Sequence, residues 1–123
     1  PVAVMIGHLQ LPGLTGTEPA SLSEPAYDLL RSGGYGGPPF DGLAFTDDLY
    51  TMRAINQRYT VPEAVLRALQ AGADVALWVT TEHVTDTLDR LEQAVTTGEL
   101  SLQHVNDALR RVAAAKGVKP ACG

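Results

Sequence analysis

The sequence has little cysteine and little positive charge. Its only cysteine, Cys122, stands next to the C-terminal residue, so no disulfide can form within the chain. Nine lysine and arginine residues stand against fourteen aspartate and glutamate residues, and the basic ones are scattered along the 123 positions. A net charge of -5 without a basic cluster argues against a nucleic acid or an anionic membrane surface as partner. No apolar run approaches the roughly 20 residues of a membrane span.

Metal-binding side chains are also sparse. The three histidines, His8, His83 and His104, have no metal-ligand spacing, so the sequence predicts no metal site and no cofactor. We expect His104 at the surface and His83 near the rim of a site. The glycine-rich loop 33–39 lacks the Gly-Lys-Ser/Thr ending of a phosphate-binding loop and precedes a strand rather than a helix. Phosphate binding by this loop is therefore excluded. Trp78 lies in an apolar run, where core packing is expected.

The chain does contain short apolar runs that alternate with helical patterns. Strands are predicted over residues 2–6, 43–45 and 74–79, where apolar residues follow one another without polar alternation. Helices are predicted over 21–32, 60–72, 84–97 and 101–116, from capping residues, early prolines and terminal glycines. The order β-α-β-α-β-α-α predicts an α/β fold, with a parallel sheet covered by helices on both faces.

Two carboxylates follow the second predicted strand. Asp47 and Asp48 come directly after Leu43-Ala44-Phe45-Thr46, at the C-terminal strand edge where parallel α/β proteins bind ligands. Because neighbouring residues of a strand point to opposite faces, only one of the two aspartates can face inward. We expect Asp48 to be the structural one, capping a helix from Leu49 to about Asn56.

Three parallel strands are too few for a finished sheet. The apolar edges of such a sheet need further pairing, and the chain opens directly on a strand. We therefore expect this chain to be a piece of a larger sheet or barrel.

Several stretches together resemble the C-terminal part of the barrel of a family 3 glycoside hydrolase. They also resemble, more closely, its β-N-acetylglucosaminidase (β-hexosaminidase) group, in the actinobacterial, mycobacterial-lipoprotein branch. The stretches are Val4 to Pro12, Pro19 to Ser23, Phe40 to Leu49, Ala68 to Leu77 and Gly98 to Lys116. The resemblance implies the last three βα units of a TIM (β/α)8 barrel plus closing C-terminal helices. Residues 1–117 would be the C-terminal portion of the barrel domain and 118–123 a tail.

The resemblance also implies a function. Asp47 matches the family's nucleophile in retaining hydrolysis, and His8 and Met52 are expected to contact the sugar. Met52 stands one place later than in the common motif. The substrate would be a muropeptide from peptidoglycan with a terminal N-acetylglucosamine. The acid/base would be a histidine with an aspartate partner, upstream of this chain, so none of the three histidines here takes that role.

The resemblance further implies that the upstream part of the same barrel is a partner and that this chain alone is inactive. It suggests a cell-envelope or secreted lipoprotein location, with a cytoplasmic one as the alternative.

Two other functions are considered. A flavodoxin-like signalling or binding domain suits the length, and phospho-receiver domains carry paired aspartates. Their acidic pair follows the first strand and a lysine follows the last, whereas here the pair follows the middle strand and no lysine lies between Arg53 and Lys116. The second alternative is a catalytically inactive family 3 homologue. The intact motif Thr46-Asp47-Asp48-Leu49 argues against it.

Overall fold

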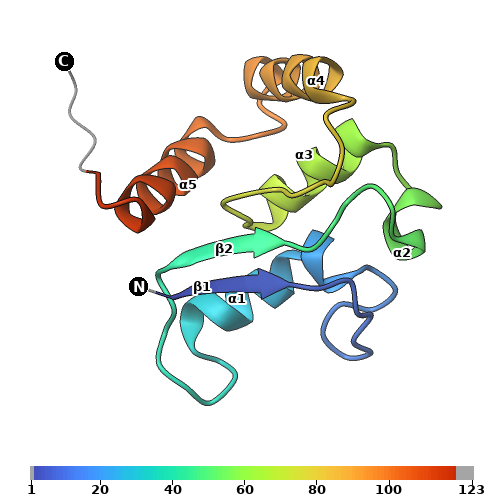
Figure 1. Ribbon diagram of the computed structural model, residues 1–123. Coiled ribbons are helices and arrows are strands. Elements are labelled where there is room, and N and C mark those ends of the chain that lie inside the picture. Colours follow the sequence, from blue (N-terminus) through green and yellow to red (C-terminus); the bar gives the residue numbers. More distant parts are fainter. Residues whose placement is uncertain (1, 119–123) are drawn as a thin grey trace.

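The computed structural model describes residues 2–118, and its two strands form a small parallel sheet (Figure 1). β1 (Ala3–Ile6) pairs with β2 (Leu43–Thr46), in a register that sets Met5 opposite Phe45 and Ile6 opposite Thr46. Both strands lie within a residue of their predicted bounds. Cys122 and the predicted tail, apart from Val118, lie outside the described residues.

The third predicted strand, 74–79, is wrong. This segment runs parallel to β2 and forms one bridge, between Val75 and Phe45, but no continuous ladder. The Leu77 N–H donates to the Thr46 hydroxyl (3.0 Å), and the Val79 N–H donates to the Asp48 carboxylate (3.2 Å). Side chains of β2 and of the turn after it thus replace backbone acceptors, and the regular strand pairing ends there.

The helices follow the predicted order with some different bounds. They are α1 (Glu24–Ser32), α2 (Arg53–Asn56), α3 (Val61–Ala71), α4 (Val84–Thr97) and α5 (Leu102–Ala115). The bounds of α4 are confirmed, and Gly98 ends it with φ 82°. The Ser101 hydroxyl accepts the His104 N–H (3.2 Å) and caps α5 as predicted. Gly72 ends α3 with φ 128°, a backbone conformation that favours glycine.

The capping box predicted at Ser21 is wrong. Ser21 lies in a short 3-10 helix, η1 (Ala20–Leu22), and α1 begins three residues later, at Glu24. The Ser21 hydroxyl is instead 2.6 Å from the His8 ring, a partner thirteen residues away. Pro25 does lie in the first turn of α1, where its missing N–H costs nothing.

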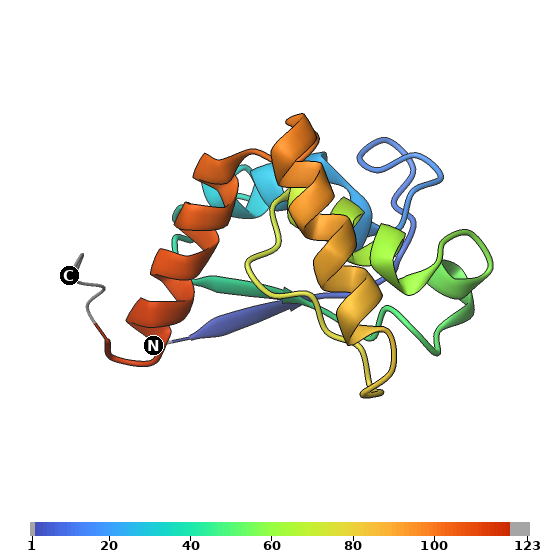
Figure 2. The same ribbon diagram turned by 90° about the horizontal axis from the view of Figure 1, so that it is seen from above.

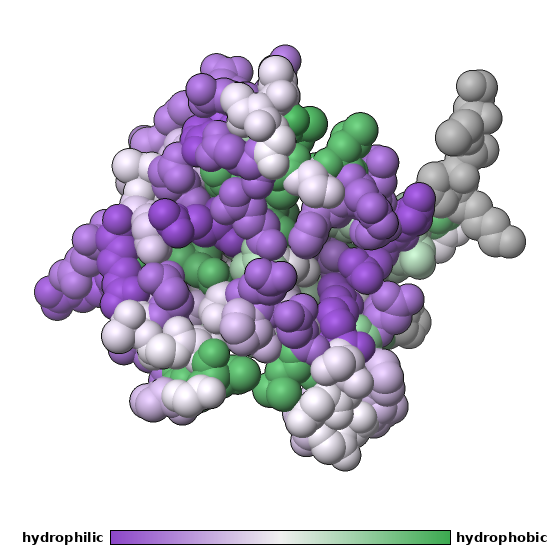
Figure 3. All heavy atoms as spheres, turned by 180° about the vertical axis from the view of Figure 1, so that it is seen from behind, coloured by the Kyte–Doolittle hydropathy of each residue, from purple (hydrophilic) through white to green (hydrophobic). Residues whose placement is uncertain are grey.

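Within residues 2–118, the helices pack on one side of the sheet rather than both, contrary to the prediction (Figure 2). The core forms between α3 and β2, around buried Ala44, Tyr27, Leu49 and Ile55. Met5, on the other face, remains 52% exposed. The outer face, seen from behind in Figure 3, is mainly hydrophilic, as expected for helices that meet solvent.

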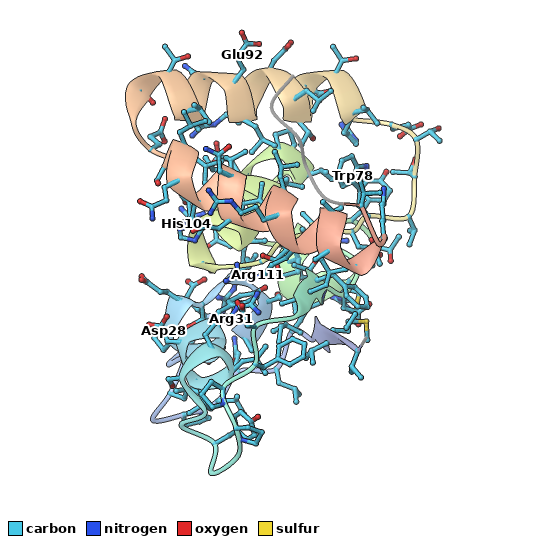
Figure 4. The ribbon with its side chains drawn as sticks, turned by 90° about the vertical axis from the view of Figure 1, so that its left-hand side faces the viewer. Asp28, Arg31, Trp78, Glu92, His104 and Arg111 are labelled. Carbon is cyan, nitrogen blue, oxygen red and sulfur yellow. The ribbon has the colours of Figure 1, made fainter. Side chains whose placement is uncertain are left out.

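An ion-pair network closes the N-terminal end of the strands. Asp74 has a buried side chain and accepts from Arg31 of α1 (2.8 Å), Arg111 of α5 (3.2 Å) and the Ala44 N–H (2.8 Å). Arg111 also pairs with Asp41 (3.1 Å). Figure 4 shows Arg31 and Arg111 close together between the two helices. Asp74 therefore ties α1 and α5 to the start of β2.

Candidate active site

Asp47 lies at the C-terminal end of β2, and one of its carboxylate oxygens has no hydrogen-bond partner within residues 2–118. Its N–H donates to the Ile6 carbonyl (3.0 Å), which continues the pairing with β1. Its Oδ1 accepts the Asp48 N–H (2.8 Å), and no donor within residues 2–118 contacts Oδ2. By strand alternation, Asp47 shares the open face of the sheet with Leu43 and Phe45. A half-buried carboxylate with a free oxygen can act as a nucleophile or a base.

Asp48 points the other way and is only 6% exposed. Its Oδ1 accepts the N–H groups of Tyr50 (3.0 Å) and Val79 (3.2 Å). Its Oδ2 accepts the Thr51 N–H (2.8 Å) and the Thr51 hydroxyl. Burial alone would raise the pKa of Asp48, but the hydrogen bonds from Thr51, Tyr50 and Val79 outweigh burial and lower it. Asp48 therefore stays ionised at neutral pH.

The helix predicted from Leu49 to Asn56 is wrong in its first turn. Asp48 takes the Tyr50 and Thr51 N–H groups, which folds residues 48–51 into a turn. Only α2, from Arg53 to Asn56, is helical. The expectation that Asp48 is structural agrees with its burial, but it caps a turn and also holds the 74–79 segment through Val79.

His8 follows β1 and is held by two protein groups. Its Nδ1 is 2.6 Å from the Ser21 hydroxyl, and its Nε2 is 2.8 Å from the Asp48 carbonyl. Because a carbonyl only accepts, Nε2 must carry the proton of this bond. A sugar contact by His8 stays a prediction, and both ring nitrogens already have partners in this arrangement.

Met52 lies just before α2 and is 39% exposed. Its predicted sugar contact is likewise untested. A cleft of about 830 Å³ is lined by residues 49–51, 56–62, His83 and Asp86, and by neither Asp47, His8 nor Met52. His83 lines this cleft, next to the Tyr50 ring at a centroid distance of 5.7 Å, and its place at the rim of the Asp47 site stays a prediction. His104 is exposed, as predicted.

Other predicted features are placed as follows. Trp78 is partly buried against the core, but in a loop rather than a strand, and its Nε1 donates to the Glu82 carbonyl (3.0 Å). No three histidine, cysteine or acidic side chains in residues 2–118 could together hold a metal ion. No helix in the same range has the length and apolar character of a membrane span.

Sequence reasoning missed three residues that shape the site: Ser21, Thr46 and Thr51. Thr46 is fully buried, and its hydroxyl accepts the Leu77 N–H. Strand alternation could have indicated this, because it places Thr46 on the same face as Ala44 and Asp48, the face covered by the helices. The partners of Ser21 and Thr51 depend on tertiary folding, and no local pattern announces them.

A family comparison decides what this arrangement belongs to. Residues 1–115 match the model of the glycosyl hydrolase family 3 N-terminal domain. The chain belongs to glycosyl hydrolase family 3. The β-hexosaminidase LpqI of Mycobacterium tuberculosis is 63% identical over the whole chain, which spans about a third (32%) of the length of that relative.

Solved family 3 structures have the same fold. A family 3 glycosyl hydrolase from Mycobacterium smegmatis superposes with a TM-score of 0.92 at 67% identity, covering 93% of this chain and 36% of that one. A β-N-acetylglucosaminidase from Thermotoga maritima superposes with a TM-score of 0.83 at 28% identity, covering 96% of this chain and 26% of that one. The family membership leaves the flavodoxin-like alternative without support.

Proposed function

We propose that this chain is the nucleophile-bearing part of a retaining β-N-acetylglucosaminidase, with Asp47 as nucleophile. The observation that carries the proposal is the free Oδ2 of Asp47 at the C-terminal end of β2. Family membership and relatives named β-hexosaminidase and β-N-acetylglucosaminidase support it. An intact, half-buried carboxylate at this position argues against an inactive homologue.

The proposed reaction has two steps. Asp47 Oδ2 bonds to the anomeric carbon as the bond to the leaving oxygen breaks, and that oxygen takes the electron pair and a proton from a general acid. Water then attacks the anomeric carbon, the bond to Asp47 Oδ2 breaks, and the group that acted as general acid takes a proton from the water. The sugar leaves with its configuration retained, and the Asp47 carboxylate is restored.

Two candidate groups, Asp48 and His8, are poorly suited to act as the general acid. Asp48 accepts four hydrogen bonds, and both ring nitrogens of His8 are occupied. Neither neighbour of Asp47 is therefore free to protonate a leaving group. We propose that the upstream part of the same polypeptide supplies the acid, as a histidine with an aspartate partner.

We further propose that the upstream part completes a TIM barrel around residues 1–117, with 118–123 as a tail. Two exposed apolar residues with the same orientation as Phe45 support this: Met5 (52%) of β1 and Val79 (63%) of the segment beside β2. The helices lie on the opposite side (Figure 2). In a barrel, such an open face becomes the packed interior, and the unpaired edge of β1 finds its neighbour.

The finer features of the function rest on the resemblance. We propose a muropeptide carrying a terminal N-acetylglucosamine as substrate, sugar contacts by His8 and Met52, and work at the cell envelope. Turnover of purified muropeptides, compared with that of simple N-acetylglucosaminides, tests the substrate.

The first test is kinetic and uses the full-length parent protein. Asp47→Ala should lose roughly 4–7 kcal/mol of transition-state stabilisation in hydrolysis of a chromogenic N-acetylglucosaminide. Added azide should restore turnover, because the small anion enters the vacated space and forms a glycosyl azide of inverted configuration. Asp89→Asn, which changes an exposed aspartate of α4, is the matched control and should retain full activity. Near-normal turnover by Asp47→Ala without azide would rule out the role.

A further inference from the structure

The candidate nucleophile is held by a neighbour whose own contacts reach three separate segments. The only hydrogen bond to the Asp47 carboxylate within residues 2–118 comes from the Asp48 N–H, at 2.8 Å to Oδ1. The position of that N–H sets where Oδ1 lies, and so where the free Oδ2 points. What fixes the Asp48 peptide therefore fixes the reacting oxygen.

The Asp48 peptide is fixed from both of its ends. On the side-chain end, the carboxylate holds the turn at Tyr50 and Thr51 and the backbone of Val79 in the segment after α3. On the backbone end, the Asp48 carbonyl accepts from His8, which follows β1 and is itself held by Ser21. Three segments, which follow β1, β2 and α3, thus meet at one residue.

We propose that Asp48 is a positioning residue for Asp47: its buried, four-fold hydrogen-bonded carboxylate and its His8-bonded carbonyl lock the peptide that aims Asp47 Oδ2 at the anomeric carbon. This inference rests on the proposed function of Asp47. It assigns Asp48 a part in the rate of the covalent step and not only in the stability of the fold.

The four donors require a carboxylate. Each oxygen of Asp48 receives two donors: Tyr50 and Val79 at Oδ1, and the N–H and hydroxyl of Thr51 at Oδ2. Asparagine has nearly the same shape but offers only one acceptor oxygen. At the Oδ1 position its NH₂ group would face the N–H groups of Tyr50 and Val79. At the Oδ2 position it would face the Thr51 N–H, although the Thr51 hydroxyl can turn and accept. Asp48→Asn therefore removes at least one hydrogen bond, sets a donor against a backbone donor, and loosens the turn that follows Asp47.

The test measures the rate constant and the extent of covalent labelling separately, on the full-length parent protein. An activated fluorinated sugar that traps the glycosyl-enzyme is followed by intact mass. Asp48→Asn should label to the same final extent as wild type, on Asp47, but at least 30-fold more slowly. Thr51→Val, which removes one of the four donors, should label 3- to 10-fold more slowly. Asp89→Asn should stay within twofold of wild type. Azide should accelerate turnover by Asp47→Ala and not by Asp48→Asn.

The outcomes separate positioning from folding. If Asp48→Asn labels at the wild-type rate, with only a lower extent or melting temperature, its role is structural alone and the inference is wrong. If Asp48→Asn does not fold, Thr51→Val decides in its place, and an unchanged labelling rate there overturns the inference. Label on Asp47 together with a wild-type rate for Asp48→Asn refutes only the inference. Label on another residue of the wild type refutes the proposed nucleophile as well.

Discussion

Replacing Asp74 by alanine should destabilise the protein more than any change to an exposed ion pair. The Asp74 side chain is 1% exposed and accepts from Arg31, Arg111 and the Ala44 N–H. Its removal leaves the Ala44 N–H buried without an acceptor, which costs about 1–3 kcal/mol. It also leaves two arginines without their buried partner, an effect of about 3–5 kcal/mol for fully buried pairs.

The free-energy loss from the two arginine pairs is smaller than the value for fully buried pairs. Their side chains are 20% and 27% exposed, so water replaces part of the lost interaction, and Arg31 keeps its bonds to the Phe40 and Gly42 carbonyls. Since the two losses share one side chain, they do not add fully. We expect Asp74→Ala to lower the free energy of unfolding by about 3–5 kcal/mol in all.

The assay is urea unfolding of the full-length parent protein, followed by circular dichroism. Asp107→Ala is the matched control, because Asp107 pairs with Arg110 on the exposed side of α5, three residues apart. Such a pair contributes about 0.5 kcal/mol or less. Equal midpoints for Asp74→Ala and Asp107→Ala would show that the network at the start of β2 does not hold α1 and α5 in place.

Two further predictions concern the site and the helix ends. Hydrogen bonds lower the pKa of Asp48 in the folded protein, so its stabilising effect should be complete above its unfolded pKa of about 4 and should disappear as the pH falls through the folded value. Acid unfolding of Asp48→Asn should accordingly depend less on pH below about 4 than that of wild type, and parallel curves would contradict this reasoning. Gly72→Ala should cost more than Gly98→Ala: both have positive φ, but the new Cβ at 72 would lie 2.9 Å from the Tyr27 Cβ, whereas nothing lies within 4 Å at 98. We expect about 2–4 kcal/mol against about 1 kcal/mol by thermal unfolding, and equal losses would exclude the clash.

The helices that sequence reasoning placed best have local signals at their ends. Gly98 ends α4 and Ser101 caps α5 through groups within a few residues, so short patterns in the sequence are enough to predict them. Strands β1 and β2 are equally predictable from the sequence, because each is a short apolar run between turn residues.

Three of the errors share one physical cause: distant groups take hydrogen bonds that local patterns assign elsewhere. Ser21 forms no capping box because its hydroxyl contacts His8. The 74–79 segment is not a strand because Thr46 and Asp48 side chains accept its N–H groups. Residues 49–51 are a turn because Asp48 holds them. Asp47 could be proposed as nucleophile from its motif. The hydrogen bonds that hold Asp48, and through its N–H the Asp47 carboxylate, can be recognised only in the three-dimensional structure.

The most direct measurement of the central claim is the identity of the residue that carries the trapped sugar. The full-length parent protein is incubated with an activated fluorinated sugar, digested, and its peptides are sequenced by mass spectrometry. We expect a single modified peptide with the sugar ester on Asp47. A modified residue other than Asp47, or turnover of an N-acetylglucosaminide without any covalent intermediate, would contradict it.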